Sequence, residues 1–254
     1  MIDVLRAKYE VDGFVIIDLK DYWGVIEKAA VSTDRISDER GFDRYRSCNG
    51  ILQLAFNRVV LNTLAGLYDA VPFPFQTLNF PDSPEQGVHS DEIHFSSYPF
   101  GLMAGVWVAL CDVTLDMGPL FVIPGSHKFS HVFLSDLGRS VSRDNAGWLK
   151  NLGFFTRHWD ELILRDRLVK VPVLLRKGQA VIWASNLLHG SFKKLGGGRR
   201  LSQVTHYFFR GGRYCTPGLS DFKSGDIQFR EPFELLRYGQ SKKVIGAELC
   251  GPGA

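Results

Sequence analysis

The sequence predicts a single, mainly β domain of the sandwich or jelly-roll class with flanking helices. From residue 75 onward, short apolar runs alternate with turns rich in Gly, Pro, Asp and Ser, a pattern typical of all-β folds. The first 74 residues instead mix helical and strand spacing. A chain of 254 residues that is 45% hydrophobic can bury a large core as one domain.

Residues 1–74 are expected to form a scaffold. A short amphipathic helix begins the chain, a buried strand rich in β-branched residues follows at 13–18, and a second helix covers 22–31. Residues 34–50 are charged and turn-rich. Apolar residues repeat at helical spacing over 60–68, and Pro72 and Pro74 should end that helix.

Residues 75–209 are expected to form the barrel core. A helical, charge-rich insert at about 133–168 interrupts it, and residues 210–254 follow as a capping segment. The predicted core strands are 75–80, 102–113, 120–123, 171–175, 180–184 and 201–209.

Composition and charge argue against several classes of partner. The net charge of +3 and pI near 8.6 are mild, and the basic residues are mostly scattered, so a nucleic-acid partner has little support. The amino terminus lacks the continuous apolar core of a signal peptide, and we expect no apolar run near the roughly 20 residues that span a bilayer. The four cysteines show no Cys-x-x-Cys spacing. We therefore expect a cytoplasmic protein with no membrane partner. The sequence leaves the oligomeric state undecided.

His89, Asp91 and the distant His189 form the most informative pattern. On an extended chain, positions i and i+2 project to the same face, so His89 and Asp91 can bind one ion. Pro81, Pro84 and Gly87 disfavour a helix there. Two imidazoles and one carboxylate leave coordination positions open, which suits a non-haem Fe(II) that binds a co-substrate and O2 together.

A second His-x-Asp, at His158 and Asp160, tests how specific this pattern is. It leads into the helical insert, and on a helix positions i and i+2 point away from each other. We therefore expect neither residue to bind the metal. His189 alone could equally be a core histidine bonded to backbone. Its neighbours favour a ligand, because Gly190 permits close backbone approach and Ser191 projects to the same face.

Arg200 is predicted to bind the carboxylate of the co-substrate. The glycines at 196–198 are expected to return the chain as a hairpin that brings this guanidinium near His189. A planar guanidinium grips a carboxylate with two parallel hydrogen bonds. Arg199 is the competitor, because a slip of one residue changes the face. If the strand alternates, Arg200 shares a face with Val204 and His206, and we favour it.

Three segments resemble the phytanoyl-CoA dioxygenase family of Fe(II)- and 2-oxoglutarate-dependent oxygenases. They are residues 9–15 (Tyr-Glu-Val-Asp-Gly-Phe-Val), residues 88–128, ending in Asp-Met-Gly-Pro-Leu-Phe-Val-Ile-Pro-Gly-Ser-His-Lys, and residues 177–200. The resemblance implies a double-stranded β-helix, that is, a cupin-like jelly roll. It implies Fe(II) bound by His89, Asp91 and His189, and 2-oxoglutarate held by Arg200, eleven residues after the late histidine.

The same resemblance implies Ser191 as an auxiliary hydroxyl donor to 2-oxoglutarate. Gln76 and Asn79 are weaker candidates for cofactor or substrate contact, with ordinary sheet hydrogen bonding as the simpler interpretation. His94 and His206 could line the pocket or be structural, and His127 is assigned to a turn. Trp107 and Trp183 are interpreted as core packing rather than as platforms for substrate.

The implied reaction consumes 2-oxoglutarate and O2, releases succinate and CO2, and hydroxylates or otherwise oxidises an unactivated C–H bond of a small biosynthetic metabolite. The substrate, an acyl-CoA or another small molecule, stays open. So does the choice among hydroxylation, desaturation, cyclisation, epoxidation and demethylation. The alternatives are a cupin-like metal oxygenase without 2-oxoglutarate and a catalytically silent metabolite-binding protein. A nucleic-acid dealkylase has little support from the scattered charge.

Overall fold

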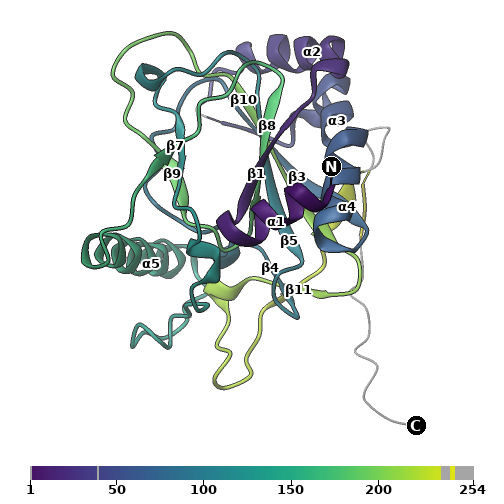
Figure 1. The fold of residues 1–254 in the computed structure, drawn as a ribbon. Helices are drawn as coiled ribbons and strands as arrows, with labels where there is room; N and C mark the ends of the chain where they lie inside the picture. The colour runs from purple at the N-terminus through teal and green to yellow at the C-terminus, as the bar shows by residue number, and fades with distance from the viewer. Residues whose placement is uncertain (1, 39, 236–240, 244–254) are drawn as a thin grey trace.

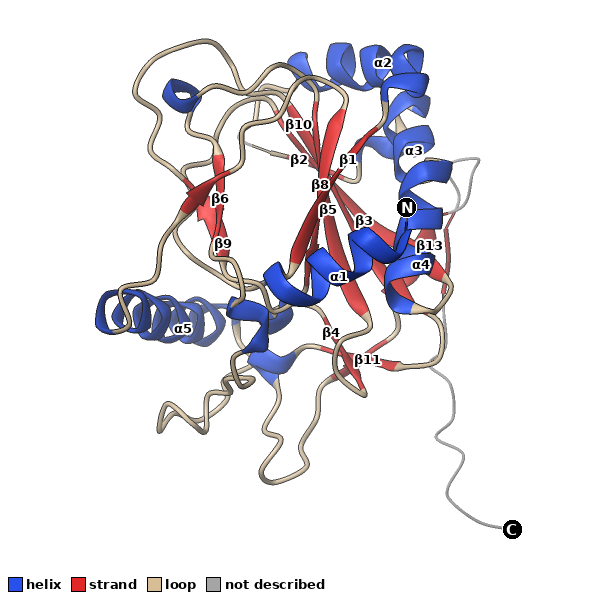
Figure 2. Cartoon of the chain, in the orientation of Figure 1, coloured by secondary structure: helices blue, strands red, loops and turns tan. Residues whose placement is uncertain are grey.

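A computed structural model describes residues 2–38, 40–235 and 241–243, and Figures 1 and 2 show a β sandwich with helices outside it. The helices are α1 (Ile2–Asp12), α2 (Trp23–Asp34), α3 (Asn49–Ala55), α4 (Arg58–Tyr68) and α5 (Asn145–Arg165). The strands are β1 (Phe14–Asp18), β2 (Gly41–Phe42), β3 (Pro72–Phe80), β4 (Ser96–Tyr98), β5 (Met103–Ala109), β6 (Leu120–Val122), β7 (Val171–Pro172), β8 (Gln179–Ala184), β9 (His189–Ser191), β10 (Ser202–Phe209), β11 (Arg213–Cys215), β12 (Phe229–Arg230), β13 (Phe233–Leu235) and β14 (Ser241–Lys243).

The large sheet separates two cores. Its strands run in the order β1-β8-β5-β10-β3-β2, with antiparallel neighbours. Helices α1 to α4 cover one face, as Figure 1 shows, and the small sheet β7-β6-β9 faces the other. Successive strand residues point to opposite faces, so Ile182 packs against the helices while Trp183 packs between the two sheets. The predicted jelly roll is confirmed.

The predicted strands and helices lie close to their expected positions, but the large sheet crosses the expected boundary at residue 74. Strand β1 pairs with β8 along its whole length, so the amino-terminal segment supplies an edge strand of the core sheet. Helix α5 occupies most of the expected insert. Strand β13 lies against β3, and residues 236–240 and 244–254 of the expected capping segment lie outside the described residues.

The expected hairpin around residues 196–198 is wrong. Strand β9 pairs with β6 in the small sheet, whereas β10 pairs with β3 and β5 in the large sheet. The glycine-containing loop therefore carries the chain from one sheet to the other. Leu195 and Gly196 both donate backbone hydrogen bonds to the Asp116 carbonyl, which fixes the loop as it crosses.

One apolar stretch corrects the expectation that no segment approaches the length of a membrane span. Residues 49–68 pass that test by length and composition, and 50% of the stretch is buried inside the protein. It consists of two helices, α3 and α4, and Asn57 begins the second one. Core helices of globular proteins pass the same test, and these two pack against the large sheet.

Asn57 should stabilise the fold as the N-cap of α4. Its side-chain Oδ1 accepts hydrogen bonds from the backbone N–H groups of Val59 and Val60 at 2.9 and 3.3 Å. Asn57→Ala should cost about 1 kcal/mol of unfolding free energy, which lowers the melting temperature of a chain of this size by about 2 to 4 °C. Asn62→Ala, at an exposed position inside the same helix, is the matched control and should not destabilise. Equal melting temperatures for the two variants would refute the cap.

Candidate active site

His89 and His189 are held side by side by their backbones. The N–H of each residue donates to the carbonyl of the other, at 2.9 and 3.0 Å, in an isolated antiparallel bridge. Ser90 is extended, with φ of −122° and ψ of 134°, before a short 3-10 turn begins at Asp91. The segment is therefore extended where the i, i+2 argument requires it.

Gly190 allows the two segments to approach. A Cβ at this position would lie 2.6 Å from the Phe121 ring and 2.8 Å from the Gln86 carbonyl oxygen. The next residue, Ser191, donates its backbone N–H to that same Gln86 carbonyl at 2.8 Å. A larger residue at 190 would push the His189 strand away from the His89 segment.

Backbone carbonyls fix the orientation of both imidazoles. The Nδ1 atom of His89 lies 2.9 Å from the Gly87 carbonyl, and that of His189 lies 2.9 Å from the Leu187 carbonyl. Each Nδ1–H therefore donates to a carbonyl, which leaves each Nε2 lone pair free. These Nε2 atoms lie 3.9 and 3.7 Å from Oδ1 of Asp91.

The three side chains converge on one point. Their ligand atoms all lie within 4.8 Å of one another, a spacing that can hold a metal ion. Burial, together with the neighbouring His189, lowers the pKa of His89 to about 3. Burial alone would raise the pKa of Asp91, but His189, His206 and His89 together hold it below its usual range. A neutral imidazole and an ionised carboxylate are the forms that bind metals.

Arg200 lies in the wall of the same cavity. Its side chain is 1% exposed, and its guanidinium lies 5.5 Å from the centre of the Trp107 ring. Burial lowers its pKa to about 10, so the group is still a cation at neutral pH. Within the described residues, its Nε and Nη1 atoms are buried and have no hydrogen-bond partner. A buried cation with unpaired donors is unfavourable unless an anion completes it.

Arg199 is placed elsewhere. Its Nη1 atom pairs with the Asp34 carboxylate at 2.6 Å, and its Nε donates to the Pro81 carbonyl at 3.1 Å. Arg200, Val204 and His206 all line the cavity, as expected from strand alternation, whereas Arg199 does not. Of the two arginines, only Arg200 can meet an anion there.

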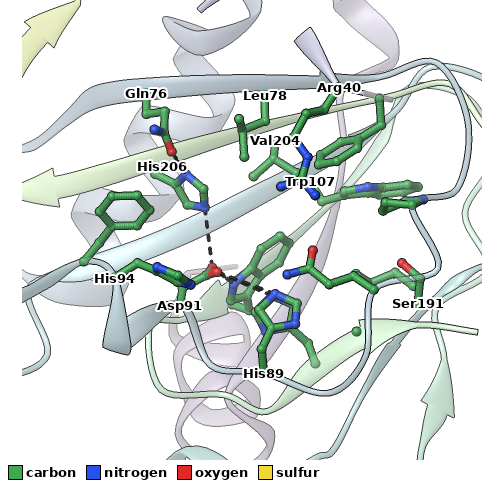
Figure 3. A pocket seen from close by; sticks show the side chains of 18 of the residues that line it. Arg40, Gln76, Leu78, His89, Asp91, His94, Trp107, Ser191, Val204 and His206 are labelled. Atoms are coloured by element: carbon green, nitrogen blue, oxygen red, sulfur yellow. Dashed lines mark hydrogen bonds and ion pairs between the residues drawn. The ribbon is translucent and has the colours of Figure 1, made fainter. Parts of the chain in front are cut away.

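The cavity has a volume of about 240 Å³, and most of the charged side chains that line it are cationic. Asp91 is the sole carboxylate among its lining residues in the described part of the chain, against two arginines, Arg40 and Arg200. Figure 3 shows Arg40, from the segment expected to be charged and turn-rich, projecting into it, and this residue was not predicted as part of the site. The site therefore favours anionic ligands once Asp91 is neutralised by a metal.

Ser191 and Gln76 both line the cavity, and the sequence predicted both as cofactor contacts. Figure 3 shows Ser191 on the side opposite Gln76. The amide of Gln76 lies 3.1 Å from Nδ1 of His206, so it is bonded to a protein partner. Asn79 points away, toward Thr33 at 2.9 Å, and takes no part in the cavity.

The other histidines considered in the sequence lie partly in the cavity and partly outside it. His94 and His206 line the cavity. His127 lies in the turn after β6, where its Nε2 is 3.2 Å from the Glu10 carbonyl. His158 and Asp160 both lie on α5, where the i, i+2 spacing keeps them from sharing an ion.

The two tryptophans were interpreted as core packing, and both also line the cavity. Trp107 lies beneath Arg200, and the indole Nε1–H of Trp183 donates to Oδ2 of Asp91 at 2.8 Å. Alternation along apolar strands gave no sign of this bond, because it depends on a residue far away in sequence.

Comparison with known proteins identifies the family. The phytanoyl-CoA dioxygenase (PhyH) family model matches residues 27–202, which is most of the chain. The Bos taurus "Phytanoyl-CoA dioxygenase domain-containing protein 1" is 27% identical over 133 residues, covering 52% of this chain and 42% of that protein. The chain thus aligns with less than half the length of this curated relative.

Two solved structures share the fold. The epimerase SnoN in complex with Fe3+, alpha ketoglutarate and nogalamycin RO has a TM-score of 0.63 at 19% identity, covering 84% of this chain and 85% of SnoN. EctD from S. alaskensis with 2-oxoglutarate and 5-hydroxyectoine has a TM-score of 0.61 at 17% identity, covering 82% and 76%. The fold and the family resemblance in the sequence are confirmed, and the chain belongs to the phytanoyl-CoA dioxygenase family.

Proposed function

We propose that the protein is a non-haem Fe(II)- and 2-oxoglutarate-dependent dioxygenase. His89, Asp91 and His189 would hold the iron, and Arg200 would hold the distal carboxylate of 2-oxoglutarate, with Ser191 as a second donor. Together, Fe(II), 2-oxoglutarate and O2 supply an oxidant for unactivated C–H bonds, with succinate and CO2 as products. The cytoplasmic location expected from the cysteine pattern is part of this proposal.

The unpaired guanidinium of Arg200 is the observation that carries the proposal. Arg200 is 1% exposed, and its Nε and Nη1 atoms have no hydrogen-bond partner among the described residues. Burying such a cation costs free energy unless an anionic ligand pairs with it. A dicarboxylate that binds the metal at one end and Arg200 at the other would fill open coordination positions and also pair with the guanidinium. A cupin-like oxygenase without 2-oxoglutarate would leave this cation unpaired, so the site favours the 2-oxoglutarate reading.

The residues of the site bind and orient rather than exchange protons with substrate. The imidazoles of His89 and His189 are fixed by carbonyls, so they present Nε2 to the metal without rearrangement. Apolar walls from Leu78, Val204 and Trp107 limit the water around the co-substrate. The protein's contribution is to hold a substrate carbon close to the metal and to exclude competing reactions.

For the substrate, we propose a small metabolite. The cavity of about 240 Å³ must also take 2-oxoglutarate, so only a small group can be enclosed beside it. The two solved structures of similar fold are described with nogalamycin RO and with 5-hydroxyectoine, neither of which is an acyl-CoA. Hydroxylation is the simplest outcome, and the other oxidations remain alternatives within the same site.

The test is an anaerobic titration of the metal-free protein with Fe(II) and then with 2-oxoglutarate. A chelated keto acid on ferrous iron gives a weak visible charge-transfer band, which we expect to appear and to saturate with 2-oxoglutarate. Succinate, which lacks the keto group, is the matched control and should give no band. Iron binding without a band at any concentration of 2-oxoglutarate would support the cupin-like alternative instead.

A further inference from the structure

We propose that Trp183 and His206 are positioning residues that hold the Asp91 carboxylate by Oδ2, so that Oδ1 alone is presented to the metal. This inference rests on the proposed function, because it takes His89, Asp91 and His189 as the metal ligands. It adds a role for Trp183, which was interpreted from the sequence as core packing, and for His206, for which lining the pocket and a structural role were both left open.

The two oxygens of Asp91 have different neighbours. Oδ2 accepts the indole N–H of Trp183 at 2.8 Å and lies 3.5 Å from Nε2 of His206. Oδ1 faces the Nε2 atoms of His89 and His189, at 3.9 and 3.7 Å. Figure 3 shows the contacts of Asp91 with His206 and with His89 as dashed lines. A carboxylate can only accept, so Nε2 of His206 carries a proton when it faces Oδ2.

We call the two groups that face Oδ2 of Asp91, the Trp183 indole and the His206 imidazole, the clamp. The register of the large sheet places both of them. Gly105 on β5 lies opposite Trp183 on β8 and also opposite His206 on β10. His206 in turn lies opposite Gln76 on β3. The four residues form one row across neighbouring strands, on the face that meets the small sheet. Asp91 reaches this row from the loop before β4.

Gly105 makes room in the middle of the row. A Cβ there would lie 2.4 Å from Cε2 and 2.6 Å from Nε1 of the Trp183 indole. The indole therefore lies flat across the glycine, which turns its N–H toward Asp91. Any side chain at 105 would displace the donor without removing a polar group.

His206 is held from three sides. Its Nδ1 atom lies 3.1 Å from Oε1 of Gln76. Its ring centre lies 6.0 Å from that of Phe75, with the rings stacked, and 5.2 Å from that of Phe95. The side chain is 3% exposed, so the imidazole has little freedom to turn away from Oδ2. A donor fixed in this way can orient its partner.

The consequence is a carboxylate that uses one oxygen as a metal ligand. If Oδ2 were free, Asp91 could rotate and bind through both oxygens, which would occupy a position that the co-substrate or O2 needs. Partners of metal ligands outside the coordination sphere commonly change metal affinity about 10- to 100-fold. We therefore expect the clamp to affect both affinity and coordination number.

The experiment uses Co(II) as the probe, with the whole 254-residue chain and no 2-oxoglutarate. Trp183→Phe keeps most of the ring and removes the N–H. It should weaken Co(II) binding about tenfold and change the position and intensity of the visible d–d bands, as measured by titration and absorption. Trp159→Phe, in the buried face of α5, is the matched control and should leave the affinity and spectrum unchanged.

Two further substitutions separate orientation from general packing. His206→Phe should change affinity and spectrum in the same direction as Trp183→Phe, and His206→Gln, which restores an N–H donor, should recover part of both. Gly105→Ala should reproduce the loss by displacing the indole. Circular dichroism and melting temperature identify any variant that has lost its fold. The folded variants then decide whether Trp183 and His206 orient Asp91.

The outcomes distinguish the clamp from the proposed function. Wild-type protein that binds Co(II), with folded Trp183→Phe and His206→Phe variants of equal affinity and identical spectra, would overturn the clamp and leave the dioxygenase proposal standing. Wild-type protein that binds no Co(II) would overturn both. A tenfold loss that His206→Gln partly reverses supports the clamp, because a purely structural role would not depend on the donor.

Discussion

Replacing Arg200 with alanine should raise the concentration of 2-oxoglutarate that half-saturates the charge-transfer band by about 30-fold or more, since truncating one partner of a buried charge pair costs about 2 to 5 kcal/mol and each 1.4 kcal/mol is about tenfold. The loss is large because the guanidinium is 1% exposed, so water cannot replace it. Fe(II) binding should stay within about twofold, since in this structure Arg200 contacts none of the three proposed ligands.

Arg199→Ala is the matched control for this prediction. It removes the same charge one residue earlier, but its guanidinium pairs with Asp34 and the Pro81 carbonyl outside the cavity. It should leave the 2-oxoglutarate titration unchanged. Arg200→Lys should fall between wild type and Arg200→Ala, because it keeps the charge and loses the planar pair of donors. If Arg199→Ala and Arg200→Ala shift the titration equally, Arg200 is not the anchor.

Asp91→Asn should abolish tight Fe(II) binding and, with it, all turnover of 2-oxoglutarate. The substitution keeps the shape of the side chain but removes the negative charge that faces two imidazoles. An uncharged amide oxygen is a much poorer ligand than a carboxylate, and the site would retain only two nitrogen ligands. Anaerobic titration with Fe(II), followed by measurement of succinate under O2, checks both parts.

The second His-x-Asp of the chain offers the control. Asp160→Asn makes the same chemical change on α5, beside His158, and should leave Fe(II) affinity and succinate formation unaltered. Because the spacing of the two motifs is identical, a difference between the variants shows that the spacing alone does not make a metal site. Retention of full Fe(II) affinity in Asp91→Asn would remove Asp91 from the ligand set.

Much of the fold could be predicted from the sequence because local patterns carry it. Alternating apolar strands and Pro or Gly breaks placed β3, β5, β8 and β10 within a few residues of their observed bounds. The short strands β2, β4 and β11 to β14 were missed, since two or three residues carry little periodicity, whereas β6 and β7, which are as short, were predicted because they lie in longer apolar runs. Helix α3 was missed because it has only seven residues, and its exposed polar side consists of Asn49 and Gln53 alone, which is too short a pattern to show helical spacing.

The hairpin expected near residue 197 failed for a different reason. A glycine turn between two apolar strands is compatible with a hairpin and equally with a crossing between sheets. The choice depends on which strands are free to pair, and β10 is taken by β3 and β5. Arg200 still enters the cavity, since its position on the approach to β10 shares the face of Val204 and His206.

The sequence by itself determined the identity and local spacing of the proposed metal ligands and the arginine, because His89 and Asp91 sit two residues apart on an extended chain and need only backbone geometry to share a face. Only the tertiary structure decided how the carboxylate of Asp91 is held. Trp183, His206 and Gly105 come from three strands, and strand register, which no local pattern encodes, sets them in one row beneath Asp91.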